Sequence, residues 1–487
     1  MKRGDIIQGT VGDTTFPNHG SVLYDNCKIK VKGVLPGQTV ELRIKRSSQE
    51  KAEGMLLQVL TPSPIETAAP RCPQFGICGS CTLQTVPYDA QLALKEAHIK
   101  KLLQPVIRDT EECEWRPIAA SPSAYEYRNK MEFTFGDEYR DGPLTLGQHK
   151  KGSMYDLVSA NECCLIDRDV RAIVAETLAY AKEQGLPFFH KMRHEGYLRH
   201  LLIRKARLTG EILADIVTTT SQEHDWSGWV SRITALPLSG KLCGLLHTSN
   251  DSSADTIVNE GTETLFGQDF ITEELLGLRF KISAFSFFQT NSEGAEVLYT
   301  KVRDMVRSVA ADLPDNGVIF DLYSGTGTIG QLLAPIARKV VGIEIVEEAV
   351  EAATANASAN GLTNCEFVAG DVLRKIDEVA ERPDFIVLDP PREGINPKAL
   401  TKILAYGVDH MVYISCKPTS LAHDLAAIQD AGYRVRAVQP VDMFPQTPHV
   451  ETVCLLSNRK PDSHIKLSLD MDEYYDIIEK EEAEKKK

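Results

Sequence analysis

A regular alternation of short apolar strands and helix-like segments, from about residue 285 to 458, constrains this chain most. The strands that this pattern predicts are 318–322, 339–343, 365–368, 385–388, 410–414 and 452–456. Strands that alternate with helices are typical of a parallel, doubly wound sheet. We therefore expect an α/β fold whose C-terminal part is Rossmann-like.

The residues upstream follow other patterns. Residues 1–62 alternate short β-type runs with glycine turns, which favours a small barrel of the oligonucleotide-binding type, although a generic β module fits as well. Segments 127–135 and 201–204 resemble strands and 170–183 a helix, which predicts a mixed α+β central part. We expect domains at 1–62, 63–284 and 285–460, followed by an acidic tail at 461–487.

Composition limits the location and the partners. No apolar run reaches the ~18 residues of a membrane helix, and no signal peptide is visible. These observations predict a cytoplasmic protein with no membrane partner. The net charge of −14 argues against a nucleic-acid binder. Basic residues nevertheless cluster, for example at Lys28, Lys30 and Lys32, so an RNA substrate is weakened but not excluded.

A glycine-rich turn follows the strand at 318–322. Gly325, Gly327 and Gly330 have the Gly-x-Gly-x-x-Gly spacing, which lets a backbone turn tightly and approach a ligand. Glu344 ends the next strand, where an acid accepts hydrogen bonds from ribose hydroxyls. Asp371 follows the third strand, where it meets an adenine amino group. Together these features fit S-adenosylmethionine better than NAD; glycines kept only for packing are the alternative.

Reactive side chains follow the later strands. Asp389 begins an Asp-Pro-Pro-Arg corner, and Cys416 ends the fifth strand at the same edge of the sheet. Open α/β sheets bind ligands at this edge. His449 and Glu451 precede the last strand, near the same cleft. Taken alone, Cys416 reads as a buried core cysteine, as most free cysteines do.

Three cysteines lie close together in the sequence, at Cys72, Cys78 and Cys81. Their Cys-x5-Cys-x2-Cys spacing suits a metal or iron–sulfur centre. Cys163 and Cys164 are the source of a fourth ligand. Four cysteines also suit tetrahedral zinc, which is the main rival.

The combination of motifs resembles the S-adenosylmethionine-dependent RNA uracil-C5-methyltransferase family. The matching stretches are Ser-Phe-Phe-Gln-Thr-Asn at 286–291, the loop after Asp321, Asp-Pro-Pro-Arg at 389–392, Ser-Cys-x-Pro at 415–418 and His-Val-Glu at 449–451. The N-terminal barrel is similar to the family's TRAM domain, and the matches extend to about residue 458.

The resemblance implies roles for individual residues. Cys416 is the nucleophile that adds to uracil C6, and Glu451 is the base that removes the C5 proton. We expect the surroundings of Cys416 to favour the thiolate. By the same resemblance, the cofactor and substrate cleft is lined by Gln289, Tyr323, Glu344 and Asp389.

The resemblance also implies a [4Fe–4S] cluster held by Cys72, Cys78, Cys81 and a fourth cysteine. The family's fourth cysteine is often followed two positions later by Ile. Ile166 gives that spacing to Cys164, with Cys163 as the alternative.

Family members with both the barrel and the cluster mostly resemble 23S ribosomal RNA enzymes. We therefore expect a monomer that acts on 23S rRNA, with tRNA as the second choice. A non-catalytic RNA-binding iron–sulfur protein is the rival class. The chain departs from the family pattern at Lys417, usually Asn, and also at Ser324, Ser420 and His423.

Overall fold

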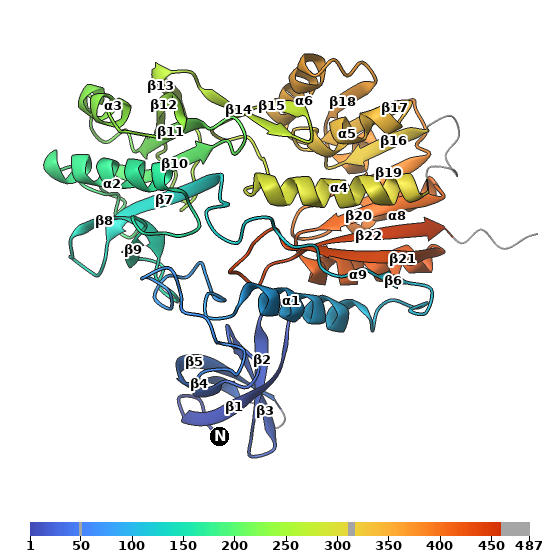
Figure 1. Ribbon diagram of the computed structural model, residues 1–487, viewed down its shortest axis with the longest axis horizontal. Helices are drawn as coiled ribbons and strands as arrows, with labels where there is room; N and C mark the ends of the chain where they lie inside the picture. The colour runs from blue at the N-terminus through green and yellow to red at the C-terminus, as the bar shows by residue number, and fades with distance from the viewer. Residues whose placement is uncertain (48–50, 310–316, 459–487) are drawn as a thin grey trace, which may run out of the picture.

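The computed structural model describes residues 1–47, 51–309 and 317–458. The expected acidic tail at 461–487 lies outside these residues. Three sheet-based parts are visible: a barrel at the N-terminus, a central sheet and a C-terminal sheet with its helices (Figure 1). Within the described residues, no helix is long and apolar enough to cross a membrane. The α/β fold with an N-terminal barrel and a mixed central part is confirmed.

The N-terminal part is a closed five-stranded barrel with the strand order β1-β2-β3-β5-β4. Its strands are β1 (Ile6–Thr15), β2 (His19–Tyr24), β3 (Cys27–Lys32), β4 (Thr39–Ser47) and β5 (Lys51–Thr61). Apolar side chains alternate along β3, so that Ile29 and Val31 are buried inside the barrel. The intervening lysines face solvent.

The central part is a seven-stranded sheet with the order β13-β12-β11-β10-β7-β8-β9. Its elements are β7 (Lys130–Asp137), β8 (Leu144–His149), β9 (Leu157–Ser159), α2 (Arg168–Glu183), β10 (Leu198–Lys205), β11 (Glu211–Thr218), α3 (Ser227–Thr234), β12 (Lys241–Ser249) and β13 (Thr262–Gly267). A hairpin of β14 (Phe270–Leu275) and β15 (Leu278–Ser283) leads to the C-terminal part. The first strand begins at Lys130, three residues after the predicted start.

The C-terminal part is an eight-stranded sheet with the order β18-β17-β16-β19-β20-β22-β21-β6. Its strands are β16 (Val318–Leu322), β17 (Lys339–Glu344), β18 (Cys365–Ala369), β19 (Phe385–Leu388), β20 (His410–Ser415), β21 (Tyr433–Val441), β22 (Glu451–Asn458) and β6 (Glu114–Trp115). The five strands from β16 to β20 are parallel, as expected. However, β22 runs antiparallel to both β20 and β21, because β21 returns directly into it.

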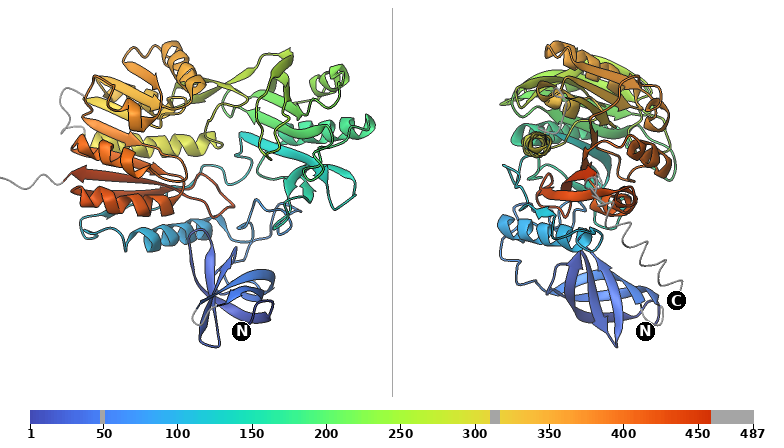
Figure 2. Two further views of the ribbon diagram at one scale, coloured as in Figure 1. Left: turned by 180° about the vertical axis from the view of Figure 1, so that it is seen from behind. Right: turned by 90° about the vertical axis from the view of Figure 1, so that its right-hand side faces the viewer.

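Helices cover both faces of this sheet (Figure 2). They are α1 (Tyr88–Leu103), α4 (Ser292–Ser308), α5 (Thr328–Leu333), α6 (Glu347–Ala359), α7 (Val372–Lys375), α8 (Pro397–Ala405) and α9 (Pro418–Asp430). Residues of α4 and α5 share one apolar core with the sheet, and residues of α1, α8 and α9 share the other. The strand order reverses between β16 and β19. Open α/β sheets bind ligands in a crevice at the carboxyl ends of strands at such a point.

Candidate active site and cysteine pocket

The glycine turn between β16 and α5 lies at this crevice. Tyr323, Gly325 and Gly327 all have positive φ angles, of 68°, 54° and 70°. A Cβ on Gly327 would lie 2.5 Å from the ring of Phe367, so a side chain does not fit there. The turn therefore keeps its backbone bare at the point where a ligand approaches the sheet.

Glu344 is held against the glycine turn. Its Oε2 accepts a hydrogen bond from Gly325 N at 2.9 Å, and its Oε1 accepts one from Val346 N at 3.0 Å. Each carboxylate oxygen keeps a second lone pair, so a ribose diol can still bind. Asp371 lies further along the edge, where it is exposed and caps α7 by accepting from Leu373 N at 2.9 Å.

Three acidic side chains lie behind this edge. Burial raises the pKa of Asp321 to about 7, although its Oδ2 accepts from Gly330 N at 2.8 Å. Burial and the nearby Asp321 raise the pKa of Asp389 to about 7. Burial and then Asp389 raise the pKa of Glu451 to about 8, with Arg392 opposing. The Asp321 Oδ1 is buried without a hydrogen-bond partner. These buried carboxyl groups favour a cationic ligand at this edge of the sheet.

Cys416 and Glu451 come together because their strands are adjacent. Ser415 at the end of β20 pairs with Thr452 on the antiparallel strand β22. Cys416 and Glu451 are the next residues on these two strands, so they lie across from each other. Burial, Glu451 and Asp389, in that order, raise the pKa of the Cys416 thiol to about 11. The prediction that the surroundings favour the thiolate is therefore wrong for the ligand-free protein. Two carboxyl groups outweigh the single opposing charge of Arg392.

Sequence reasoning missed two neighbours of this pair. Tyr299 on α4 is buried, and its hydroxyl is hydrogen bonded to the side chain of Gln289. Burial raises the pKa of Tyr299, and the carboxyl groups of Asp389 and Glu451 raise it further. Arg392 was recognised only as part of a motif, yet it is the cation that acts on both Cys416 and Glu451. A tyrosine in an amphipathic helix gives no sequence signal of such a role.

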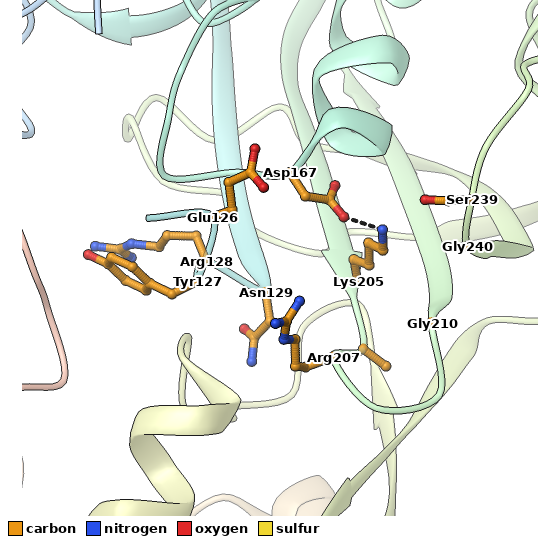
Figure 3. A pocket seen from close by; sticks show the side chains of 11 residues that line it. Glu126, Tyr127, Arg128, Asn129, Asp167, Lys205, Arg207, Gly210, Ser239 and Gly240 are labelled. Carbon is orange, nitrogen blue, oxygen red and sulfur yellow. Dashed lines mark hydrogen bonds and ion pairs between the residues drawn. The ribbon is translucent and has the colours of Figure 1, made fainter. Parts of the chain in front are cut away.

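The segment that carries Gln289 is fixed to the central sheet. Asn129 Nδ2 donates to Gln289 O and to Ser292 Oγ, both at 2.8 Å, and Asn129 N donates to Thr290 O at 3.0 Å. Asn129 also lines a cavity of about 170 Å³, in which Lys205 forms an ion pair with Asp167 (Figure 3). No residue of the Cys416 crevice lines that cavity, so it is a separate feature of the central part.

Lys417, the unexplained departure, is exposed. It is the N-cap residue of α9, where its side chain makes no capping hydrogen bond. Its backbone N–H donates to Ser415 Oγ at 3.3 Å. This departure from the family pattern therefore changes a helix cap next to Cys416 and removes none of the proposed reacting groups.

All the predicted metal ligands line one pocket, although they come from two distant segments. Cys72, Cys78, Cys81, Cys163 and Cys164 are its sulfur-bearing residues. The thiol of Cys164 is hydrogen bonded to Cys72 and lowers the pKa of that thiol. Gln84 Nε2 donates to Cys164 Sγ at 3.3 Å, and its Oε1 accepts from Cys72 N at 3.0 Å.

The donor set fits a centre held by four thiolates. As the side chains stand, no group of three or more His, Cys, Asp or Glu residues in ranges 1–47, 51–309 and 317–458 is arranged to hold a metal ion. Loading would therefore require the thiols to turn toward one another. Cys163 and Cys164 are both available for the fourth position.

Comparison with known proteins agrees with this architecture. A Rossmann-like sheet, a glycine turn and a strand-end thiol beside an acid define a methyltransferase-type crevice. The model of the family described as tRNA (uracil-5-)-methyltransferase matches residues 87–459. The chain belongs to this family and is an RNA (uracil-5-)-methyltransferase. The barrel and the cysteines Cys72, Cys78 and Cys81 lie outside the matched residues.

Relatives cover nearly the whole chain. An uncharacterized RNA methyltransferase of Caldanaerobacter subterraneus subsp. tengcongensis is 46% identical over 94% of this chain and 99% of its own. One from Clostridium acetobutylicum is 44% identical over 94% and 99%. The crystal structure of the Pyrococcus abyssi tRNA (uracil-54, C5)-methyltransferase, in complex with S-adenosyl-L-homocysteine, matches with a TM-score of 0.70 and 25% identity, over 92% of this chain and 100% of that chain.

Proposed function

We propose that the protein transfers a methyl group from S-adenosylmethionine to C5 of a uridine in RNA, with Cys416 as nucleophile and Glu451 as base. The observation that carries the proposal is the pairing of β20 with β22, which sets these two side chains side by side next to Asp389. Gln289, Tyr323, Gly325, Glu344, Asp371 and Asp389 form the proposed cofactor site. The S-adenosyl-L-homocysteine complex of the Pyrococcus abyssi enzyme supports this choice of cofactor.

Each side chain has one chemical task. The Cys416 thiolate forms a bond to uracil C6, and the electron pair of the C5–C6 double bond moves onto C5 and the O4 carbonyl. C5 then takes the methyl group, and the methyl donor leaves as a neutral thioether. Glu451 removes the C5 proton, the C5–C6 double bond re-forms and the sulfur leaves C6. A positioned base typically contributes ~10²–10⁴-fold to such a step.

The raised pKa values are consistent with a reaction that begins only in the complete complex. Burial, Glu451 and Asp389 raise the pKa of Cys416, and burial and Asp389 raise the pKa of Glu451. A bound sulfonium supplies the methyl group and a positive charge, which lowers both pKa values. A cation bound in the crevice therefore favours the thiolate.

Two variants test the proposal. Cys416→Ala should abolish both methyl transfer and the covalent RNA adduct, because no sulfur can add to C6. Glu451→Gln should still form the adduct but retain it, because the C5 proton stays in place. Tritiated methyl transfer and denaturing gels measure the two quantities. Methyl transfer at the wild-type rate by Cys416→Ala would exclude covalent catalysis.

We further propose a [4Fe–4S] cluster on Cys72, Cys78, Cys81 and Cys164. The shared pocket and the pairing of Cys164 with Cys72 support this set, with Cys163 as the alternative ligand and zinc as the alternative metal. An anaerobic preparation should be brown and contain about four irons per chain, as the cluster requires. A colourless preparation with one zinc would overturn the cluster.

For the RNA target we propose 23S rRNA, because the barrel and the cysteine set resemble those enzymes. The likeness to a tRNA (uracil-54) enzyme over 92% of this chain favours tRNA as the second candidate. Unmodified 23S rRNA fragments and tRNA transcripts should be compared in one assay, with the product mapped by mass spectrometry. Methylation of tRNA alone would reverse the order.

The division into domains at 1–62, 63–284 and 285–460, the monomeric state and the cytoplasmic location stay predictions. One observation bears on the second boundary. Strand β6, which lies within 63–284, pairs with β21 of the C-terminal sheet. We propose that the segment around α1 and β6 folds with the C-terminal domain, although it precedes the central sheet in the chain.

A further inference from the structure

The loop from Asp442 to Val450, here called the base loop, leads directly into Glu451. Its backbone is unusual at Gln446, whose φ of 68° lies in the left-handed region that non-glycine residues rarely adopt. Such a conformation persists only where surrounding contacts enforce it. Gln446 is 1% exposed, so its contacts with the rest of the protein are the relevant ones.

Gln91 on α1 makes the contacts that hold this residue. Its Oε1 accepts from Gln446 N at 3.0 Å, and its Nε2 donates to Gln446 Oε1 at 3.0 Å. The same Nε2 lies 3.1 Å from Leu83 O and 2.8 Å from Val86 O. Gln91 is itself 1% exposed, so every polar contact of its side chain is made inside the protein.

The other side of Gln446 is joined to the segment that follows Cys81. Gln446 O accepts from Thr82 N at 3.0 Å and from Leu83 N at 3.1 Å. Gln91 therefore bonds to two segments that also bond to each other, the base loop and the cysteine-bearing segment. A change of one segment must be accommodated by the other, because they are joined directly by hydrogen bonds.

The remaining anchors of the base loop lie on either side of Gln446. Lys95, one helical turn after Gln91, pairs with Asp442 at 2.6 Å and donates to Phe444 O at 3.1 Å. Tyr127 OH donates to Pro445 O at 3.0 Å. Removing the buried Lys95 would leave an unpaired charge and unfold the region. The amide of Gln91 is neutral, so its replacement leaves no unpaired buried charge.

We infer that Gln91 is a positioning residue for the base: through Gln446 it fixes the base loop, and thereby Glu451, relative to Cys416 and to the cysteine-bearing segment. The inference rests on the proposed function, since it assigns Gln91 to the removal of the C5 proton. Gln91 touches no reacting atom. Its loss should therefore slow the step that Glu451 performs and leave addition of Cys416 to C6 largely intact.

The variant Gln91→Met keeps the side-chain volume and removes every hydrogen bond. We expect kcat to fall about 10–100-fold, the effect of displacing a catalytic group by about 1 Å, with less than a threefold change in KM for RNA. Covalent RNA–protein adduct should accumulate on uridine-containing RNA, since the adduct forms but resolves slowly. Gln91→Asn, which keeps the amide but is one methylene shorter, should act in the same direction and serves if Gln91→Met does not fold.

His98→Gln is the matched control, since His98 lies on the same helix, is 3% exposed and bonds to Thr14 Oγ1 of the barrel at 2.7 Å. It should lower stability without accumulation of adduct. The inference would be overturned if the Gln91 variants kept the wild-type kcat. It would also be overturned if the Gln91 and His98 variants lost adduct formation and turnover to the same extent. Wild-type protein that forms no adduct with 5-fluorouridine RNA would instead overturn the proposed function.

Discussion

At the scale of single residues, the crevice combines a thiol and three carboxyl groups that oppose one another's ionisation. Each of these groups is less stable as an anion in the folded protein than in water, because burial removes its hydration and the neighbours add repulsion. Such perturbed pKa values are typical of functional sites. A cationic ligand would stabilise the anionic forms and so lower these pKa values.

The coupling between Cys416 and Glu451 can be measured directly. Glu451 is ionised above pH 8 and then raises the pKa of the Cys416 thiol. Glu451→Gln removes that charge, so the thiol pKa should fall below its value of about 11. The pH dependence of iodoacetamide labelling of Cys416, followed by peptide mass spectrometry, gives this pKa.

Cys365 provides the internal control in the same sample. Burial and Asp321 raise its pKa to about 11, without a contribution from Glu451. Its labelling profile should be identical in the wild type and the Glu451→Gln variant. An unchanged or higher Cys416 pKa in the variant would contradict the electrostatic account of the crevice.

At the scale of elements, helix α9 follows Cys416, the proposed nucleophile, and has no side-chain cap. Lys417 occupies the N-cap position, and Pro418 is the first helical residue. Asparagine is among the best N-cap residues because its side chain accepts from the free N–H groups of the first turn. Lysine cannot accept such a bond and places a positive charge at the positive end of the helix dipole.

Lys417→Asn should therefore raise the free energy of unfolding by about 1 kcal/mol, the usual value of an N-cap. Thermal or urea denaturation measures the gain. Lys398→Asn, at an exposed position in the first turn of α8, which Asn396 already caps, is the control and should give no gain. A loss of stability in Lys417→Asn would show that the lysine makes a contact that outweighs the cap.

The elements also show how far sequence reasoning reaches. The strand ends that carry Tyr323, Glu344, Asp389 and Cys416 could be predicted, because apolar periodicity locates parallel strands and their carboxyl ends share one edge. Strand β22 was also predicted, at 452–456, but its antiparallel direction was not. Strand β21 was missed, since it contains arginines and a proline that obscure the pattern. The contacts of Gln91 with Gln446 join residues 355 positions apart, and local pattern carries no information about them.

At the scale of the whole molecule, the barrel is a separate part that lies beyond α1, outside the C-terminal sheet and its helices (Figure 1). Because the protein is acidic overall, basic side chains that gather on the barrel indicate a local binding surface. Lys28, Lys30 and Lys32 are exposed on alternate positions of β3, while the residues between them fill the barrel core. Burial lowers the pKa of His19, and the positive charges of Lys30 and Lys32 lower it further. The three lysines thus form a compact positive strip.

We expect this strip to bind RNA phosphates and thereby to contribute affinity without chemistry. The triple variant Lys28→Gln, Lys30→Gln, Lys32→Gln should raise KM for RNA about 10-fold or more and leave kcat unchanged. Because each phosphate contact releases about one counterion, the slope of log affinity against log salt should shrink by up to about three. The control neutralises three lysines of the C-terminal part, the exposed Lys398 and the half-buried, ion-paired Lys402 and Lys375, by Lys398→Gln, Lys402→Gln and Lys375→Gln, and should leave the salt slope unchanged. Equal effects of the two triple variants would mean that net charge alone, and not the barrel, attracts the RNA.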